Sequence, residues 1–294
     1  MPHSTYDEKG VFMRKIYIIC LCLCLVGCRN SEIKESTTKK LDITIGCRAD
    51  VSAISMSHLA KEILSQKGYV VDVETFTDGE LYEALAQNKI QAIVSAWFYK
   101  SEYVIYESVK DKVDDLGSNC EQLRRGFVVP RYVDTAEISE LTMYRSKFNN
   151  VLYYFEEIPL LNELAMEANN LYDLNYDLVE LSQQEIDDKL KEAVDEGQWI
   201  VFCGYIPHWI FAKYDVRFLA DTKNVFGEQQ EIHTLVNKDL KTENKEIYDI
   251  LKGFCLYESE LNDLLYEVNK KGTDNLKKTV FAWLIKHPHV ASRN

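Results

Sequence analysis

The chain has 294 residues, 46% of them hydrophobic and 28% charged, a composition typical of globular proteins, and its length favours two domains over one. Its 34 lysines and arginines are outnumbered by 47 aspartates and glutamates, which gives a formal net charge of -13. Because such a surface repels phosphate backbones, nucleic acid is excluded as an expected partner.

Residues 1–27 are expected to be a leader that is removed from the mature protein. The positive pair Arg14 and Lys15 precedes an apolar stretch of eleven residues at 16–26, whereas a membrane-spanning helix needs about 20. The small residue and cysteine that follow are typical of a lipoprotein signal, which makes Cys28 the expected lipid acceptor and membrane anchor. An ordinary buried strand or helix is the alternative interpretation of this stretch.

Residues 28–40 are polar and without periodicity, so they are expected to form a tether between the lipid and a body that begins at Leu41. The body starts with alternating strand and helix patterns. The expected elements are a strand at 41–46, a helix at 51–67, a strand at 69–76, a helix at 78–89 and a strand at 90–98. Such a run predicts an α/β fold with a parallel sheet, whose ligands bind beyond the carboxyl ends of the strands.

A second unit with the same alternation follows an apolar strand at 126–130. Its expected elements are a strand at 151–155, a helix at 158–172, a strand at 176–181, a helix at 183–197 and a strand at 198–204, before a strand at 231–237 and three helical stretches ending near 286. Two lobes are therefore predicted, one from residues 41–130 and 217–294 and the other from residues 131–216. Because the chain passes between the lobes more than once, a hinge-closing clamp around a ligand cleft is expected.

Aromatic residues gather at two of the expected strand ends. Trp97 ends one strand, and Tyr205 and Trp209 flank the turn after another. A quaternary ammonium group has no proton to donate, so proteins hold it against aromatic ring faces, each worth about 0.5–2 kcal/mol. A single aromatic residue more often packs in the core, which is the expectation for Trp199 and Trp283.

Residues 41–288 resemble the substrate-binding proteins of glycine betaine, proline betaine and choline importers of the ABC transporter class. The most specific segment is GYIPHWIFAKYDVRFLADTKNVFGEQQEIHTLV at 204–236, which is similar to the family's Gly-Trp-x-Pro-His-Trp segment and its Lys-Tyr-Asp continuation. Shorter ordered matches are ITIG, KGYVVDVETF, LYEALAQNKIQAIVSAWF, KVDDLGSNCEQLRRGFVVPRYV and YDLVELSQQEIDDKL. The resemblance implies a two-lobed periplasmic-binding-protein fold of type II, an extracytoplasmic location, an ABC permease as partner and a box of aromatic rings around a trimethylammonium group.

The resemblance also assigns candidate ligand-binding residues by position. Trp97 matches the box tryptophan after the third strand, and Tyr205 stands where the family usually has tryptophan. Asp50 stands where the family commonly has another aromatic residue, so it either stabilises a cation by its charge or indicates a different ligand. Trp209 is the further ring of the turn, and His233 is expected to reach the cleft as a neutral imidazole.

A second departure from the family lies at residues 153–161, YYFEEIPLL. The family often has a glycine-rich Asp-Pro-Gly-Ala-Gly loop there, whose N–H groups hold a betaine carboxylate. Glu156 and Glu157 would repel such a carboxylate, although a glutamate pair usually points to solvent. Together with Asp50, this change favours a net cation such as choline over a zwitterion.

Four cysteines lie outside the leader and the lipidation position, with no C-x-x-C pair and no pattern that assigns a disulfide: Cys47, Cys120, Cys203 and Cys255. No metal and no cofactor are expected. A thiol enzyme would need Cys47 or Cys203 beside His208 or His233, and the chain has none of the common catalytic motifs. The remaining alternative is the same fold binding a different cationic small molecule or acting as a ligand sensor.

Overall fold

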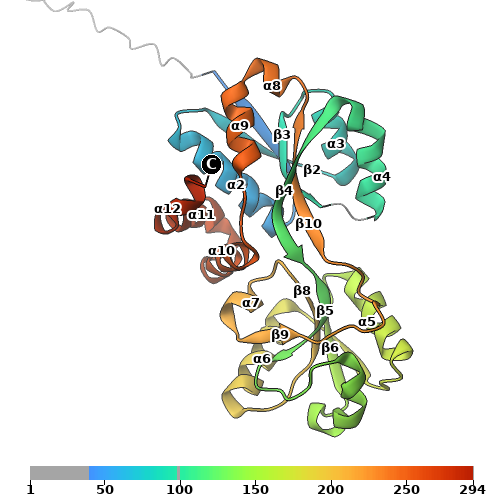
Figure 1. The fold of residues 1–294 in the computed structure, drawn as a ribbon. Coiled ribbons are helices and arrows are strands. Elements are labelled where there is room, and N and C mark those ends of the chain that lie inside the picture. Colours follow the sequence, from blue (N-terminus) through green and yellow to red (C-terminus); the bar gives the residue numbers. More distant parts are fainter. Residues whose placement is uncertain (1–39, 98–99, 294) are drawn as a thin grey trace, which may run out of the picture. The chain divides into compact units, whose positions relative to one another are not determined.

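The computed structural model describes residues 40–97 and 100–293 of the chain (Figure 1). The predicted leader, Cys28 and all but the last residue of the predicted tether lie outside the described residues. The part from Leu41 onward forms one unit that contains two five-stranded sheets. Helices accompany both sheets, which confirms the predicted α/β class with two lobes.

The first sheet has the strand order β2-β1-β3-β10-β4. Its strands are β1 (Ile43–Arg48), β2 (Val71–Phe76), β3 (Ala92–Trp97), β4 (Val113–Leu123) and β10 (Gln230–Asn237). The first three run parallel, as predicted, whereas β10 is antiparallel to both β3 and β4. β3 is buried at every position, because a continuous apolar run suits a central strand covered on both faces.

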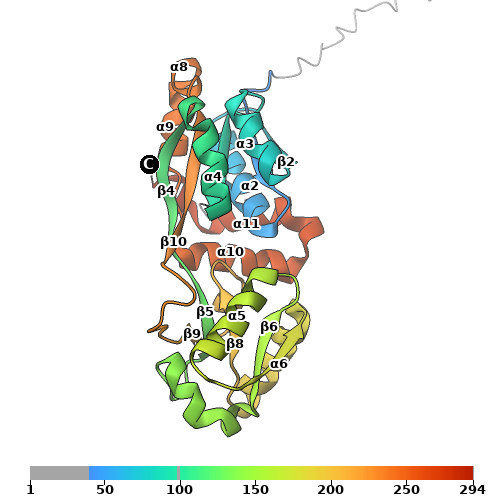
Figure 2. The ribbon, with the colours of Figure 1, turned by 90° about the vertical axis from the view of Figure 1, so that its right-hand side faces the viewer.

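Helices pack on and around the first sheet. They are α2 (Val51–Gln66), α3 (Asp78–Ala86), α4 (Lys100–Val109), the short turn η1 (Lys110–Lys112), α8 (Leu240–Glu243), α9 (Lys245–Gly253), α10 (Glu258–Lys271), η3 (Thr273–Asn275), α11 (Leu276–Lys286) and α12 (Pro288–Ala291). α10 contacts α11 of its own lobe and α7 of the second lobe. Figure 2 shows α10 lying across the boundary between the lobes. No helix in the described ranges is both long and apolar enough to cross a bilayer.

The second sheet has the strand order β7-β6-β8-β5-β9. Its elements are β5 (Arg125–Pro130), η2 (Ile138–Phe148), β6 (Val151–Phe155), α5 (Pro159–Leu171), β7 (Asp177–Leu181), α6 (Gln183–Glu196), β8 (Phe202–Tyr205), α7 (Ile210–Lys213) and β9 (Val216–Phe218). β6 runs parallel to β7 and β8, and β5 is antiparallel to β8 and β9. The alternation of strands and helices from β6 to β8 is the one predicted.

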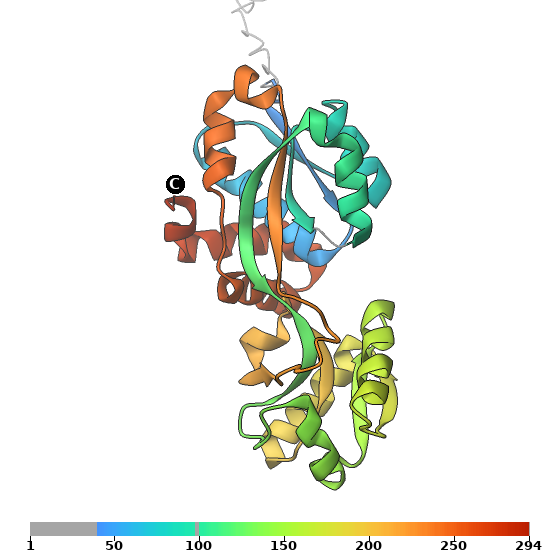
Figure 3. The same cartoon turned by 45° about the vertical axis from the view of Figure 1, so that its right-hand side comes forward.

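The chain passes between the sheets at two places that differ from the predicted boundaries. β4 leads directly into β5 near Arg124, and Figure 3 shows this crossing as one long green path. β5 joins the second sheet because its apolar residues pair with β8, from Arg125 opposite Tyr205 to Val128 opposite Phe202. The return crossing follows β9 rather than preceding it. A strand pattern by itself does not state which sheet the strand joins.

Candidate functional site

A cavity of about 680 Å³ lies where elements of both sheets meet. Its lining comes from the carboxyl ends of β1, β3 and β8, from the connection after β6, and from the start of α6. The apolar side chains of Leu265 and Val268 on α10 complete it. The position agrees with the expectation that ligands bind beyond the carboxyl ends of parallel strands.

Three of the predicted aromatic residues line this one cavity: Trp97, Tyr205 and Trp209. Trp97 comes from the first sheet, and the other two come from the end of β8 and the turn that follows it. Trp97 and Trp209 are only 9% and 7% exposed. Rings from opposite lobes therefore border the same space.

Hydrogen bonds fix the planes of the two indole rings. Trp97 Nε1 donates to Gln230 Oε1 at 2.7 Å, and Trp209 Nε1 donates to Gln183 Oε1 at 3.3 Å. The Trp209 ring also packs against the imidazole of His208, with the centroids 5.2 Å apart, and Lys213 Nζ lies 5.5 Å from its centroid. The two glutamines were not predicted, and the sequence carries no signal that pairs a tryptophan with a glutamine 133 positions away.

A second layer of rings packs behind Tyr205. The ring centroid of Phe155 lies 6.1 Å from that of Tyr205, and the imidazole of His208 lies 5.0 Å from Tyr205 and 5.2 Å from Trp209. His208 is 4% exposed, and burial lowers its pKa to about 3, so the imidazole is neutral at physiological pH. The backbone N–H of His208 donates to Asn262 Oδ1 of α10 at 2.9 Å, which connects the turn to the first lobe.

Asp50 lines the cavity, but its carboxylate is already engaged by the protein. It is the N-cap of α2, where Oδ1 accepts from the Ala53 N–H at 2.9 Å and from Ser52 Oγ at 2.8 Å. Oδ2 accepts from Arg48 Nε at 3.3 Å. Asp50 therefore stabilises the start of α2 and forms an ion pair with Arg48 in the wall of the cavity.

Two substitutions separate the capping role of Asp50 from its charge. We expect Asp50→Ala to lower the free energy of unfolding by about 1 kcal/mol, because the cap is lost, and Asp50→Asn to keep it within about 0.5 kcal/mol, because an amide oxygen also caps. Urea denaturation of the unliganded protein measures both. An equal loss in the two variants would contradict the capping role, and ligand affinity in the asparagine variant reports the charge alone.

The charged lining of the cavity is predominantly acidic. It contains one arginine, Arg48, and three carboxylates, Asp50, Asp78 and Glu157. With neutral His208, these side chains carry a net charge of two negative, which favours a cation in the cavity. Glu156, the neighbour of Glu157, is exposed and does not line the cavity.

The other predicted residues lie elsewhere. His233 on β10 is not among the lining residues, and its Nδ1 lies 3.0 Å from Asp115 while its Nε2 lies 3.3 Å from Glu231. The hydrogen bond with Asp115 raises the pKa of His233. Tyr154 and Phe155 pack in the core, as expected for residues of the VLYYF strand.

The cysteines do not form a reactive site. All four described cysteines are free thiols. Burial raises the pKa of Cys47 to about 11 and that of Cys120 to about 12, and it raises the pKa of Cys203 further still. A nucleophilic cysteine needs the opposite shift, so Cys47, Cys120 and Cys203 act as small apolar side chains. Among the residues that the structure covers, no group of histidine, cysteine and carboxylate side chains is arranged to hold a metal ion.

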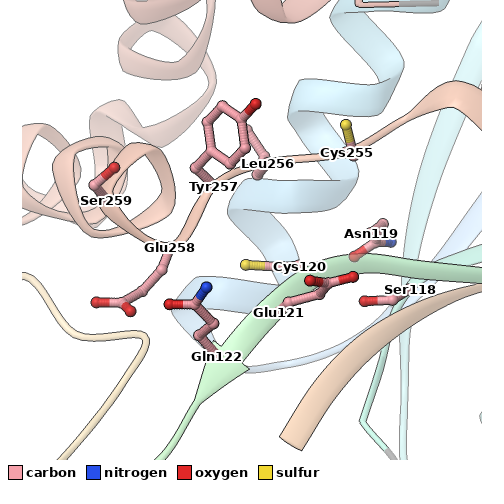
Figure 4. A pocket seen from close by; sticks show the side chains of 10 residues that line it. All are labelled: Ser118, Asn119, Cys120, Glu121, Gln122, Cys255, Leu256, Tyr257, Glu258 and Ser259. Atoms are coloured by element: carbon pink, nitrogen blue, oxygen red, sulfur yellow. The ribbon is translucent and has the colours of Figure 1, made fainter.

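A second cavity, of about 510 Å³, lies between β4 and the segment that leads into α10 (Figure 4). Its lining residues are Ser118, Asn119, Cys120, Glu121, Gln122, Cys255, Leu256, Tyr257, Glu258 and Ser259. The lining includes no tryptophan, and its single ring, Tyr257, is 66% exposed. None of the predicted ligand-binding residues belongs to it, so the cavity with the three rings is the candidate site.

Comparison with known proteins shows the family to which the chain is similar. Residues 42–286 match the family described as the substrate binding domain of ABC-type glycine betaine transport systems. Over 112 residues the chain is 35% identical to the glycine betaine/carnitine transport binding protein GbuC of Listeria monocytogenes. This match covers 38% of the chain and 37% of GbuC.

Two solved structures share the fold over most of the chain. The glycine betaine, L-proline ABC transporter binding protein ProX of Borrelia burgdorferi has a TM-score of 0.62 and 27% identity, with 85% of this chain and 94% of that chain covered. Lactococcal OpuAC, in its closed conformation complexed with glycine betaine, has a TM-score of 0.64 and 25% identity, with 86% of this chain and 99% of that chain covered.

Proposed function

Because the chain belongs to the family of substrate-binding domains of ABC-type glycine betaine transport systems, a family of transport proteins and not of enzymes, we propose that it captures a quaternary ammonium compound for an ABC importer. The candidates are glycine betaine, proline betaine and choline. Capture takes place outside the cytoplasm, and a separate permease and ATPase carry out transport.

The observation that carries this proposal is the grouping of Trp97, Tyr205 and Trp209 around one cavity. A quaternary ammonium group offers no hydrogen bond, so affinity comes from ring faces around a delocalised charge. The acidic lining supports the same class of ligand, since a cation gains from it. Rings from both lobes would close around the ligand, which links binding to the relative movement of the lobes.

A lipid anchor at Cys28 completes the proposal. The positive residues, the short apolar stretch and the cysteine that ends it support lipidation of the mature N-terminus. The tether would then hold the binding protein next to the permease, where it raises the local concentration of loaded protein. Mass spectrometry of the membrane-extracted protein, with Cys28→Ser as the unmodified control, tests this part.

Ligand-induced stabilisation tests the function itself. A ligand at 100 times its dissociation constant stabilises the folded state by about 2.7 kcal/mol, because it binds only that state. We expect purified protein from Leu41 onward to gain this stability with choline or a betaine, and not with ethanolamine or glycine, which lack the methyl groups. Thermal unfolding and titration calorimetry across such a panel measure the effect. No response to any quaternary amine at millimolar concentration would contradict the proposal.

One observation supports a second candidate function. Asp50 lines the cavity at a position where the resemblance to the family implies a ring, and a wall with fewer rings also suits a different cationic small molecule, carried or sensed by the same fold. Stabilisation by a primary or secondary amine in the same panel, in the absence of any response to quaternary amines, would favour it.

A further inference from the structure

The two neighbouring glutamates after β6 have different surroundings. Glu157 lines the cavity, and its Oε1 accepts from the N–H of Gln183, the first residue of α6, at 3.2 Å. The side chain of the same Gln183 accepts from Trp209 Nε1 at 3.3 Å. Gln183 therefore contacts the Glu157 carboxylate through its backbone N–H and the Trp209 ring through its side chain. Glu156 follows β6 directly and is exposed outside the cavity.

Three groups near the cavity that could receive a ligand carboxylate are engaged by carboxylates of the protein: the starts of α2 and α6 and the Nε of Arg48. The start of α5, which follows the lining residue Ile158, has no side-chain cap, and Glu157 directly precedes it in the chain. Helix N-termini and arginine side chains are the usual partners of such an anion. The start of α2 holds Asp50, and the start of α6 holds Glu157. Arg48 Nε lies 3.3 Å from Asp50 and 3.9 Å from Asp78. His208 adds no positive charge, because burial lowers its pKa to about 3.

We propose that the cavity selects ligands with a net positive charge and no carboxylate, and that Glu157 is a residue that determines this selectivity. The inference depends on the proposed function, since it names the class of ligand within it: a quaternary ammonium alcohol or a simple quaternary amine, and not a betaine. Glu157 attracts the ammonium group and repels a carboxylate at the same position. The hydrogen bond from the Gln183 N–H holds the Glu157 carboxylate at the wall of the cavity.

Calorimetric titration of choline and glycine betaine tests the inference with a matched pair of variants. We expect the unmodified protein to bind choline about ten-fold or more tightly than glycine betaine. The negative charge of Glu157 repels the carboxylate of glycine betaine and does not repel the neutral hydroxyl of choline. Glu157→Gln keeps the acceptor for the Gln183 N–H and is expected to reduce this preference about five-fold. Glu156→Gln changes the protein's net charge equally and is expected to leave the preference within about two-fold.

The outcomes separate the inference from the function on which it depends. Glycine betaine binding as tightly as choline, or equal effects of Glu157→Gln and Glu156→Gln, would overturn the inference and leave quaternary ammonium capture intact. Binding of neither ligand would overturn both. Unchanged thermal unfolding of the two unliganded variants would show that the effect does not come from a loss of folded protein, as expected for two exposed positions.

Discussion

Trp97→Ala is expected to weaken binding of the quaternary ammonium ligand about 30-fold. The ring is 9% exposed and borders the cavity, and a desolvated cation–π contact with tryptophan is worth about 2 kcal/mol. Its edge is held by Gln230, so the ring face meets the ligand without a loss of side-chain freedom on binding. Titration calorimetry with the tightest ligand of the panel measures the change, and Trp97→Phe should recover part of it.

Trp199 provides the control for this substitution. It packs against Tyr144 and Phe148 with ring centroids at 5.3 Å and 5.2 Å, and it does not line the cavity. We expect Trp199→Ala to lower stability and to leave the dissociation constant unchanged. If both alanine variants bound like the unmodified protein, Trp97 would be a structural residue and the ring cluster would not be the site.

The second large effect is expected for Trp209→Ala, on stability and affinity together. Trp209 is 7% exposed and belongs to the core cluster, so its removal should lower the free energy of unfolding by about 3–5 kcal/mol. The same change removes a ring that lines the cavity and packs at a tilt against His208, and we expect at least about ten-fold weaker binding. Urea denaturation and calorimetry at low temperature measure the two quantities on the same sample.

Trp283 is the matched control for the second effect. It is 2% exposed, stacks on His287 at 4.1 Å and donates through Nε1 to Asp263, away from the cavity. Trp283→Ala should cost a similar amount of stability and leave the affinity as it is. A parallel loss of affinity in this variant would mean that general destabilisation, and not the ring at 209, governs binding. Trp209→Phe extends the test if the alanine variant does not fold.

The expected elements agree with the structure wherever a local pattern is strong. The strands and helices from β1 to β3 and from β6 to β8 follow the predicted order, because apolar periodicity and capping residues are local properties. β4 was missed as a strand: VDDLGSNCEQL is polar and contains Gly117 at a φ of 99°. Its eleven residues are held by pairing with β10, which lies more than a hundred positions further along the chain.

The candidate site was predictable to the extent that it lies at strand ends. Trp97 and Tyr205 each end a strand, and ligands of α/β sheets bind beyond such ends. The two strands belong to different sheets, so their meeting at one cavity is decided by the tertiary structure. His233 was predicted to reach the cleft, but it lies within antiparallel β10 and not at the carboxyl end of a parallel strand. Its ring is hydrogen-bonded to Asp115. The sequence also left open whether Glu156 or Glu157 would face the ligand. The tertiary structure decides which glutamate lines the cavity, because the backbone N–H of Gln183 at the start of α6 donates to Glu157.

The sequence alone therefore determined the α/β alternation of the two units and which aromatic residues end a strand, because these features depend on neighbours within about one helix or strand. The tertiary structure decided which sheet β5 and β9 join, which rings share a cavity, and which side chains bond to the two indoles: Gln230 and Gln183. The physical reason is the range of the interactions. A hydrogen bond between residues 133 positions apart forms only after both strands have taken their places, so no local pattern encodes it.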